Sequence, residues 1–246
     1  MQSHRVNQQA AYVLHTRPYT ESSLIVEFFS KDYGRLAVLS KGARSQKTRK
    51  RGILQPFQPL LIGWSGKGEL PILTNAEQDQ QLNYFDYKSR VCGFYASELL
   101  YRLLQRRDPH AELFDAYHLL MSDLDRLSFQ KKDRELSLRV FEKKLLIEIG
   151  YGLILDREIQ NNQLINPDLM YHYIPERGPE IYQPTGEYSN GHSSPLVVPG
   201  LVLMCINRNQ YPNDLIMQQA KLFMRYILKL SLGAKPIQSR SLLYLS

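Results

Sequence analysis

Cysteine and long apolar runs are scarce in this sequence of 246 residues. The two cysteines, Cys92 and Cys205, lie in apolar segments with helical spacing, and so few thiols favour buried, reduced side chains over a disulfide. No apolar run approaches the roughly 20 residues of a membrane span. The polar residues 1–9 lack the apolar stretch of a signal peptide. These absences predict a cytoplasmic protein with no membrane-spanning segment.

Acidic residues are missing from residues 33–68, although the whole chain contains 24 Asp and Glu beside 31 Lys and Arg. This window holds eight cations, so it carries +8 while the whole chain carries +7 and the remaining residues sum to −1. A basic excess confined to one segment is the electrostatic footprint of a site for a polyanion. We favour binding to a nucleic-acid backbone over two alternatives, a solvated loop without a partner and a basic targeting cluster.

Signatures of catalysis and of metal binding are missing as well. The segment GWSGKGE lacks the spacing of a P-loop and fits a hairpin turn between two strands. Asp123 and Asp125 are two positions apart on a predicted helix, so their carboxylates point in different directions. The histidines, which form no pair with metal-ligand spacing, are His4, His15, His110, His118, His172 and His192. We therefore expect no catalytic residue, no cofactor and no metal.

Five short segments in the first third of the chain have the composition or the alternation of β-strands. They span residues 11–16, 22–29, 35–40, 57–64 and 69–74. The longest connection follows the third strand and is the basic segment itself. This pattern predicts a five-stranded Greek-key barrel of the OB type, with an SH3-like barrel as the alternative. OB barrels commonly bind single strands through a cationic groove with stacking aromatic residues.

Helical spacing replaces strand signals after residue 80. Helices are predicted over residues 84–107, 111–127, 133–149, 199–208 and 213–231. Residues 156–198 are polar, rich in Asn, Pro, Tyr and Gly, and are expected to be irregular. The fold class is therefore α+β in two parts. An OB-type barrel domain of residues 1–80 precedes an all-α helical domain of residues 81–246, which contains the irregular insertion.

Three motifs stand close together in the barrel region: R-P-Y-x-E-x-S at residues 17–23, G-R-x-x-x-x-x-K-G-A-R at residues 34–44 and L-Q-P-F at residues 54–57. In combination they resemble the N-terminal barrel of the RecO family of recombination mediators. The resemblance continues in LRVFEKKLLIEIGYG and in LGAKPIQSRSLL. It therefore covers nearly the whole chain and is weakest across residues 156–195.

This resemblance implies a DNA-repair protein without catalytic turnover, located in the bacterial cytoplasm at the nucleoid. Members of the family bind single- and double-stranded DNA and anneal complementary strands. Their partners are RecR and the single-stranded DNA-binding protein, whose acidic, Phe-terminated tail they engage, and they help RecA replace that protein on the strand. A nucleic-acid-processing enzyme with an unrecognised site is the alternative. The +8 window disfavours an adaptor that does not bind DNA.

Many members of that family carry a four-cysteine zinc site between the third long helix and the last helices. This chain has no cysteine there. Structural zinc needs about four N or S ligands, which His172 and His192 alone do not supply. We therefore expect a zinc-free insertion whose aromatic and apolar residues pack on the helices: Tyr171, Tyr173, Ile174 and Tyr182.

Phosphate contacts are expected from the basic segment, because guanidinium and ammonium groups displace the counterions condensed on DNA. The candidate residues are Arg35, Lys41, Arg44, Lys47, Arg49, Lys50 and Arg51, followed by Arg17 and Lys67. Bases could stack on one of four aromatic residues, each of which fits the barrel core equally well: Tyr19, Tyr33, Phe57 and Trp64.

The acidic tail of the single-stranded DNA-binding protein requires a hydrophobic pocket edged by a cation. The helix over residues 133–149 offers both kinds of side chain. From the matching L-R-x-F-E segment, the resemblance singles out Arg139, with Lys143 and Lys144 as further cations beside Leu138 and Phe141. The alternative is an ordinary amphipathic helix with solvated charges.

Overall fold

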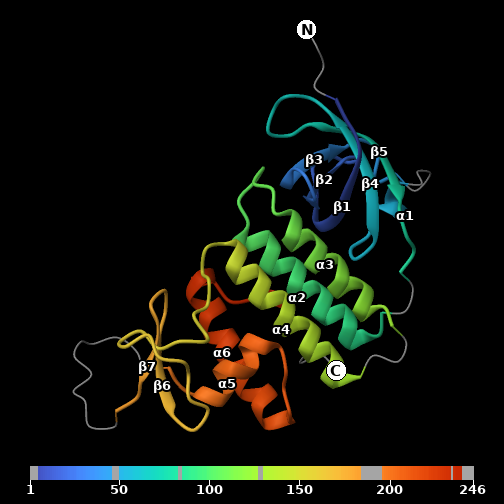
Figure 1. The fold of residues 1–246 in the computed structure, drawn as a ribbon. Coiled ribbons are helices and arrows are strands. Elements are labelled where there is room, and N and C mark those ends of the chain that lie inside the picture. The colour runs from blue at the N-terminus through green and yellow to red at the C-terminus, as the bar shows by residue number, and fades with distance from the viewer. Residues whose placement is uncertain are drawn as a thin grey trace. The chain divides into compact units, whose positions relative to one another are not determined.

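The computed structural model describes residues 5–45, 50–82, 85–126, 130–183, 196–233 and 235–239, and for Lys50 and Arg51 it describes the backbone alone. The chain divides into two compact units. One is formed by the described residues of 1–129 with those of 236–246, and the other by residues 130–235. Figure 1 labels the helices and strands of both units.

Five strands close into a barrel in the order β1-β2-β3-β5-β4. The strands are β1 (Arg5–Pro18), β2 (Leu24–Ser30), β3 (Gly34–Ser40), β4 (Pro59–Ser65) and β5 (Ile72–Gln78). β1 pairs with β2 and with β4 in antiparallel fashion, and β3 closes the barrel on β5 through a parallel pairing of Leu39 with Ile72. The predicted OB-type barrel is confirmed. The connection from β3 to β4 contains the single helical turn α1 (Lys50–Ile53).

Alternate side chains of β1 face opposite sides of the barrel wall, as the two-residue period of a strand requires. Ala11 and Val13 belong to the barrel core. Tyr12 points outward and is nevertheless fully buried. Its ring packs on Phe114 and Tyr117, with centroids 5.7 and 5.0 Å away, and both belong to α3 (Ala111–Leu124). The outer face of the barrel is thus a second packing surface.

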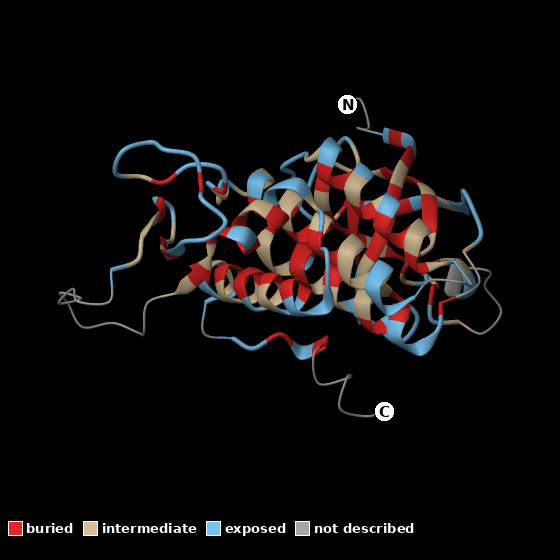
Figure 2. Cartoon of the chain, turned by 60° about the horizontal axis from the view of Figure 1, so that its bottom comes forward, coloured by how far each residue is buried: buried red, intermediate tan, exposed pale blue. Residues whose placement is uncertain are grey.

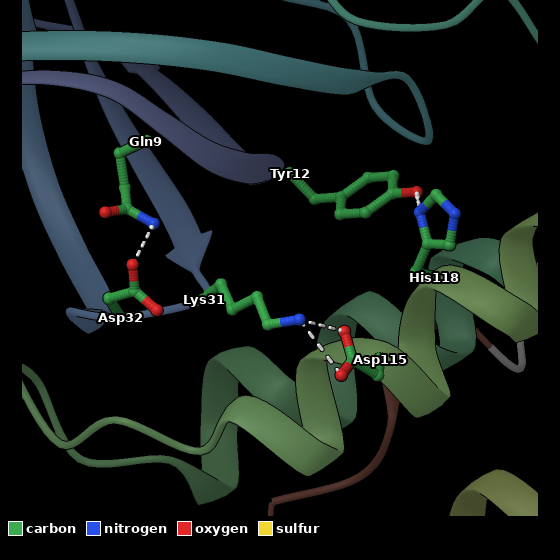
Figure 3. Close-up of polar contacts among 6 residues, drawn as sticks. All are labelled: Gln9, Tyr12, Lys31, Asp32, Asp115 and His118. Carbon is green, nitrogen blue, oxygen red and sulfur yellow. Dashed lines mark hydrogen bonds and ion pairs between the residues drawn. The ribbon is translucent and has the colours of Figure 1, made fainter.

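The helices α2 (Tyr87–Leu103) and α3 belong to the same compact unit as the barrel. Two polar contacts drawn in Figure 3 join the barrel to α3: Lys31 Nζ lies 2.7 Å from Asp115 Oδ1, and Tyr12 Oη lies 2.8 Å from His118 Nδ1. The division between the units therefore falls between residues 129 and 130. The change from strand to helix signals near residue 80 is a change of secondary structure within one unit.

The structure explains why the first position of the G-R motif, Gly34, is a glycine. Its φ is +63°, and a Cβ added there would overlap the carbonyl oxygen of Asp108 in the connection between α2 and α3. In the same connection, the amide of Arg107 donates a hydrogen bond to the carbonyl of Arg35 over 2.8 Å. Only glycine combines this backbone conformation with so close an approach.

Phe57 of the L-Q-P-F motif packs between the barrel and α2. Its ring occupies the space above Gly93, where an added Cβ would lie 2.8 Å from a ring carbon. It also packs on Phe94 in an edge-to-face contact with centroids 4.8 Å apart. Because Phe57 is buried in this way, it belongs to the packing between barrel and helix.

The second unit contains α4 (Lys131–Glu148), α5 (Gly200–Arg208) and α6 (Asp214–Leu232). It also contains a small antiparallel sheet in the order β7-β6-β8, built from β6 (Met170–Ile174), β7 (Gly178–Ile181) and β8 (Val197–Pro199). The described part of the insertion over residues 156–198, which the sequence predicts to be irregular, therefore contains short strands between its loops. These strands are three to five residues long, too short for alternation to distinguish them from loops.

Two tyrosines of β6 secure this sheet as the sequence predicts. Tyr171 and Tyr173 are both buried, and Tyr173 meets Phe223 of α6 edge to face with centroids 4.9 Å apart. Ile174 and Tyr182 are half-buried. Figure 2 marks the buried and exposed positions along the elements of each unit. Within the described ranges no helix is long and apolar enough to cross a bilayer.

Candidate nucleic-acid interface

One end of the barrel gathers three of the predicted DNA-binding cations. The turn between β1 and β2 lies beside the segment that follows β3, because the amide of Arg44 donates to Ser22 O over 3.0 Å. Arg44 Nη1 also donates to Thr20 O over 2.7 Å. Arg17, Lys41 and Arg44 are exposed at this end. We refer to these three residues, with the basic segment that continues from them, as the basic end.

The rest of the predicted cluster extends beyond the described side chains. Lys47 and Arg49 lie outside the described residues, as do the side chains of Lys50 and Arg51. The residues described in full on either side of this segment are Ser45, which follows Arg44, and Gly52 in α1. The segment therefore leaves the barrel at the basic end and returns to it through α1.

Lys67 lies at the opposite end of the barrel. β2 runs antiparallel to β3, and β4 antiparallel to β5, while β3 and β5 are parallel. The turn from β4 to β5, which carries Lys67, is consequently at the end where β3 begins. Lys67 is exposed there. The sequence provides no means of separating it from the other cations.

Arg35 has an internal set of partners. Its Nη1 lies 3.5 Å from Oε2 of the buried Glu27, its Nε donates to Leu104 O over 3.1 Å, and its guanidinium lies 5.1 Å from the ring centre of Tyr101. Arg106 also bonds to Glu27. Burial lowers the pKa of Arg35, while Glu27 opposes that shift. With its side chain 15% exposed, Arg35 offers little surface to a phosphate.

The four candidate stacking residues fall into two groups. Phe57 and Trp64 are buried, whereas Tyr19 and Tyr33 are exposed. Tyr19 lies in the turn after β1, at the basic end, and Tyr33 lies in the turn between β2 and β3, at the opposite end. A base can therefore reach the ring faces of these two tyrosines only.

The candidate partner site on α4 is largely internal. Leu138 and Phe141 are buried, and Arg139 is 4% exposed with Nη2 2.6 Å from Glu142 Oε1. The other two guanidinium nitrogens of Arg139, Nε and Nη1, have no hydrogen-bond partner among the described residues. Arg139 is thus a buried ion-paired cation with unused donors.

Lys143 and Lys144 of the same helix are engaged locally. Lys143 Nζ donates to the carbonyls of Ile206 and Asn207 near the end of α5, over 3.0 and 2.9 Å, and burial lowers its pKa. Lys144 Nζ lies 2.9 Å from Glu148 Oε1, one turn further along α4. Both cations therefore have partners within this unit.

A surface pocket that the sequence did not indicate lies where α5 passes into α6. It has a volume of about 410 Å³ and is lined by Leu201, Met204, Cys205, Arg208, Gln210, Tyr211 and Pro212. Burial raises the pKa of Tyr211 to about 12, and the charge of Arg139 opposes this shift. Glu142, the ion-pair partner of Arg139, acts on the pKa of Tyr211 in the opposite sense. We call this hollow the α5 pocket.

The described part of the chain contains no group of three His, Cys, Asp or Glu residues that could hold a metal ion. His172 instead lies 3.1 Å from Glu180 Oε1 on the neighbouring strand. That the protein binds no zinc stays a prediction, because residues 184–195, which include His192, lie outside the described residues.

Comparison with known proteins finds one family along nearly the whole chain. Residues 1–81 match the family described as Recombination protein O N terminal, and residues 84–207 match Recombination protein O C terminal. The DNA repair protein RecO of Nitrosospira multiformis is 42% identical over 241 residues, which cover 97% of this chain and 95% of the relative. That of Dechloromonas aromatica is 40% identical over 238 residues, 97% and 95% of the two chains. That of Coxiella burnetii is 35% identical over 240 residues, 98% and 99% of the two chains.

An OB barrel followed by helices, matched along nearly its whole length by such relatives, defines a DNA repair protein of the recombination class. This class is one of mediators rather than enzymes. The chain belongs to the RecO family.

Proposed function

We propose that this protein binds the backbone of single- and double-stranded DNA through the basic end of its barrel and anneals complementary strands. The observation that carries this proposal is the segregation of charge. The acid-free window of residues 33–68 carries +8, whereas the whole chain carries +7. Lys41 and Arg44 of this window are exposed beside Arg17. A neutral barrel with scattered charges would support no such function.

The physical basis is counterion release. Each phosphate neutralised by Lys or Arg frees condensed cations, which supplies affinity without reading the sequence. Annealing requires contacts of this kind, because two polyanions must approach each other and remain free to change register. No nucleotide hydrolysis or metal chemistry enters this account.

The α5 pocket supports a second part of the proposal, binding of the tail of the single-stranded DNA-binding protein. Its apolar residues Leu201 and Met204 suit a terminal Phe, and the exposed Arg208 suits acidic neighbours. Occupation of this pocket, together with binding to RecR, would bring the protein to coated strands at the bacterial nucleoid. There it would help RecA replace the coat.

An annealing assay with complementary oligonucleotides tests the first part. We expect annealing to proceed in EDTA and without ATP, and to accelerate on strands coated with the single-stranded DNA-binding protein. Loss of annealing upon chelation, or hydrolysis of added nucleotide, would show that the protein is a nucleic-acid-processing enzyme instead. A double variant Lys41→Ala/Arg44→Ala should slow annealing, whereas the control Lys229→Ala, an exposed lysine of α6, should not.

A further inference from the structure

A hollow of about 200 Å³ lies at the end of the barrel opposite the basic end. The turn between β2 and β3 contributes Asp32 and Tyr33, and β4 with its following turn contributes Trp64 and Lys67. Arg107, from the connection between α2 and α3, completes the rim. All of these elements belong to the first compact unit. We call this hollow the aromatic pocket.

Two aromatic rings line the aromatic pocket. Trp64 is 4% exposed and packs in the barrel core, so its indole is fixed. Tyr33 is 37% exposed and meets Trp64 edge to face, with ring centroids 5.0 Å apart. One face of an exposed aromatic ring beside a fixed indole is the arrangement on which a planar ring stacks.

The rim of the pocket is predominantly cationic. Lys67 and Arg107 are both exposed. Arg107 is fixed there, because its amide donates to Arg35 O over 2.8 Å and its guanidinium donates to Gly68 O. Its φ of +61° is unfavourable for a residue with a side chain. Among the described residues, Asp32 is the one acidic residue that lines the pocket, and its carboxylate accepts a hydrogen bond from Gln9 over 3.2 Å (Figure 3).

We propose that the aromatic pocket takes one unstacked base of single-stranded DNA, with its ring on Tyr33 and its flanking phosphates on Lys67 and Arg107. This proposal rests on the DNA binding proposed above and adds a second contact at the other end of the barrel. The volume is smaller than that of a typical cofactor pocket, about 300–1,000 Å³, so it suits a planar ring rather than a whole nucleotide.

The charge of the rim favours this occupant over an acidic or apolar side chain of a protein. A base is neutral and stacks on any aromatic face, and the phosphates on both sides of it require cations outside the pocket. The aromatic pocket has both features. Because a base within a duplex remains stacked, the pocket distinguishes single strands from double strands, which the basic end does not.

The one tryptophan of the chain reports directly on the pocket. The full-length protein is titrated with a single strand about ten nucleotides long, within the range of about 4–16 nucleotides that an OB fold covers. A second strand of equal length carries abasic sugar-phosphate units only. We expect the normal strand to change the emission of Trp64 and to bind more tightly than the abasic strand. Stacking of one base accounts for a difference of roughly 5- to 100-fold.

The variant Tyr33→Ala should reduce the difference between normal and abasic strands, any remainder being due to Tyr19 at the basic end, and should leave duplex affinity unchanged. Tyr87→Ala, which removes an exposed tyrosine of α2 outside the pocket, should preserve the difference. Equal melting temperatures of the two variants and the wild type would establish that both are folded. The double variant Lys67→Ala/Arg107→Ala should weaken the binding of both strands without removing the change in Trp64 emission.

Two results would overturn the proposal. One is equal affinity for normal and abasic strands without a change in Trp64 emission. The other is a difference between the strands that is as large in Tyr33→Ala as in the wild type. If either occurs while binding stays salt-dependent, the basic end still binds DNA and the aromatic pocket alone is refuted. Failure of both strands to bind at all would refute the proposed function itself.

Discussion

The hydroxyl of Tyr12 lies 2.8 Å from Nδ1 of His118, although the two residues are 106 positions apart in the chain. Tyr12 is in the first strand of the barrel, and His118 is in α3. Burial raises the pKa of Tyr12 well above its usual range, so its hydroxyl stays protonated and available for this bond. The hydrogen bond is one of the contacts that join α3 to the barrel.

Tyr12→Phe should therefore destabilise the protein. The substitution keeps the buried ring and removes one hydrogen bond, which is worth about 1 kcal/mol net. For a chain of this size we expect the melting temperature to fall by about 2–4 °C. The control is Tyr19→Phe at an exposed tyrosine, which should melt as the wild type does. Equal melting temperatures for all three proteins would contradict this role of the bond.

Gly34→Ala should be far more damaging than Gly42→Ala. Both glycines have positive φ, +63° and +71°, so both substitutions cost about 1–2 kcal/mol in backbone strain. Only at Gly34 does the added Cβ also overlap the carbonyl of Asp108, since nothing lies within 4 Å at Gly42. Urea unfolding should show Gly34→Ala to be less stable than Gly42→Ala by at least about 1 kcal/mol. Similar midpoints would mean that the α2–α3 connection does not pack on this turn.

Replacement of Lys47, Arg49, Lys50 and Arg51 by Ala should weaken single-strand binding equally for every base sequence. The slope of log K against log salt should flatten by about 0.7 for each phosphate that the variant no longer neutralises. Annealing should fall more steeply, because two backbones must be screened at once. Stability should change little, because the substitutions also remove the repulsion among four like charges in one short segment. An unchanged salt slope and annealing rate would show that this stretch is only a solvated surface.

Arg208→Glu should weaken binding of an acidic, Phe-terminated peptide by about 1–2 kcal/mol, because it reverses a charge that lines the α5 pocket. DNA binding through the barrel and the melting temperature should stay as in the wild type. Lys229→Glu makes the same change of charge on α6, outside the α5 pocket, and should bind the peptide normally. Equal weakening in both variants would indicate a general charge effect.

Arg139 is unsuitable as the first test of that pocket, although the family resemblance singles it out. Its removal leaves Glu142 buried without its ion-pair partner in the same helix, which costs about 3–5 kcal/mol in comparable cases. Weaker peptide binding in such a variant would not separate unfolding from the absence of the Arg139 charge. Arg208 avoids this difficulty because it is exposed.

The turn at Glu158 should lose stability in acid. Burial disfavours its carboxylate, but the amides of Gln160, Asn161 and Gln163 donate to it, and the net effect lowers its pKa from 4.5. A lowered folded pKa contributes stability above the unfolded value, which is lost as the pH falls through the folded value. Hydrogen exchange of these amides, corrected for intrinsic rates, should therefore accelerate as the pH falls below 4.5. Glu158→Gln should remove that dependence on pH, and a wild type that keeps full protection in acid would contradict it.

Local patterns in the sequence determined the barrel strands, the longer helices and the place of the charge. Strand alternation, helical spacing and turn residues are encoded within a few positions, so the five strands and the five long helices could be predicted from them. The acid-free window is equally a property of the sequence alone. The OB-type barrel followed from the number of strands and the position of the longest connection.

Only the tertiary structure decided how individual residues are used. It buried Tyr12 on the outer face of the barrel, paired Arg35 with Glu27, and placed Lys67 at the end opposite Arg44. It also divided the units after residue 129. These features depend on contacts between residues that are distant in the chain or on the path of strands around a barrel. Periodicity and composition do not contain that information. The same cation or aromatic side chain can lie on a surface, in an ion pair or in a core, and distant segments of the same chain that pack against it decide which.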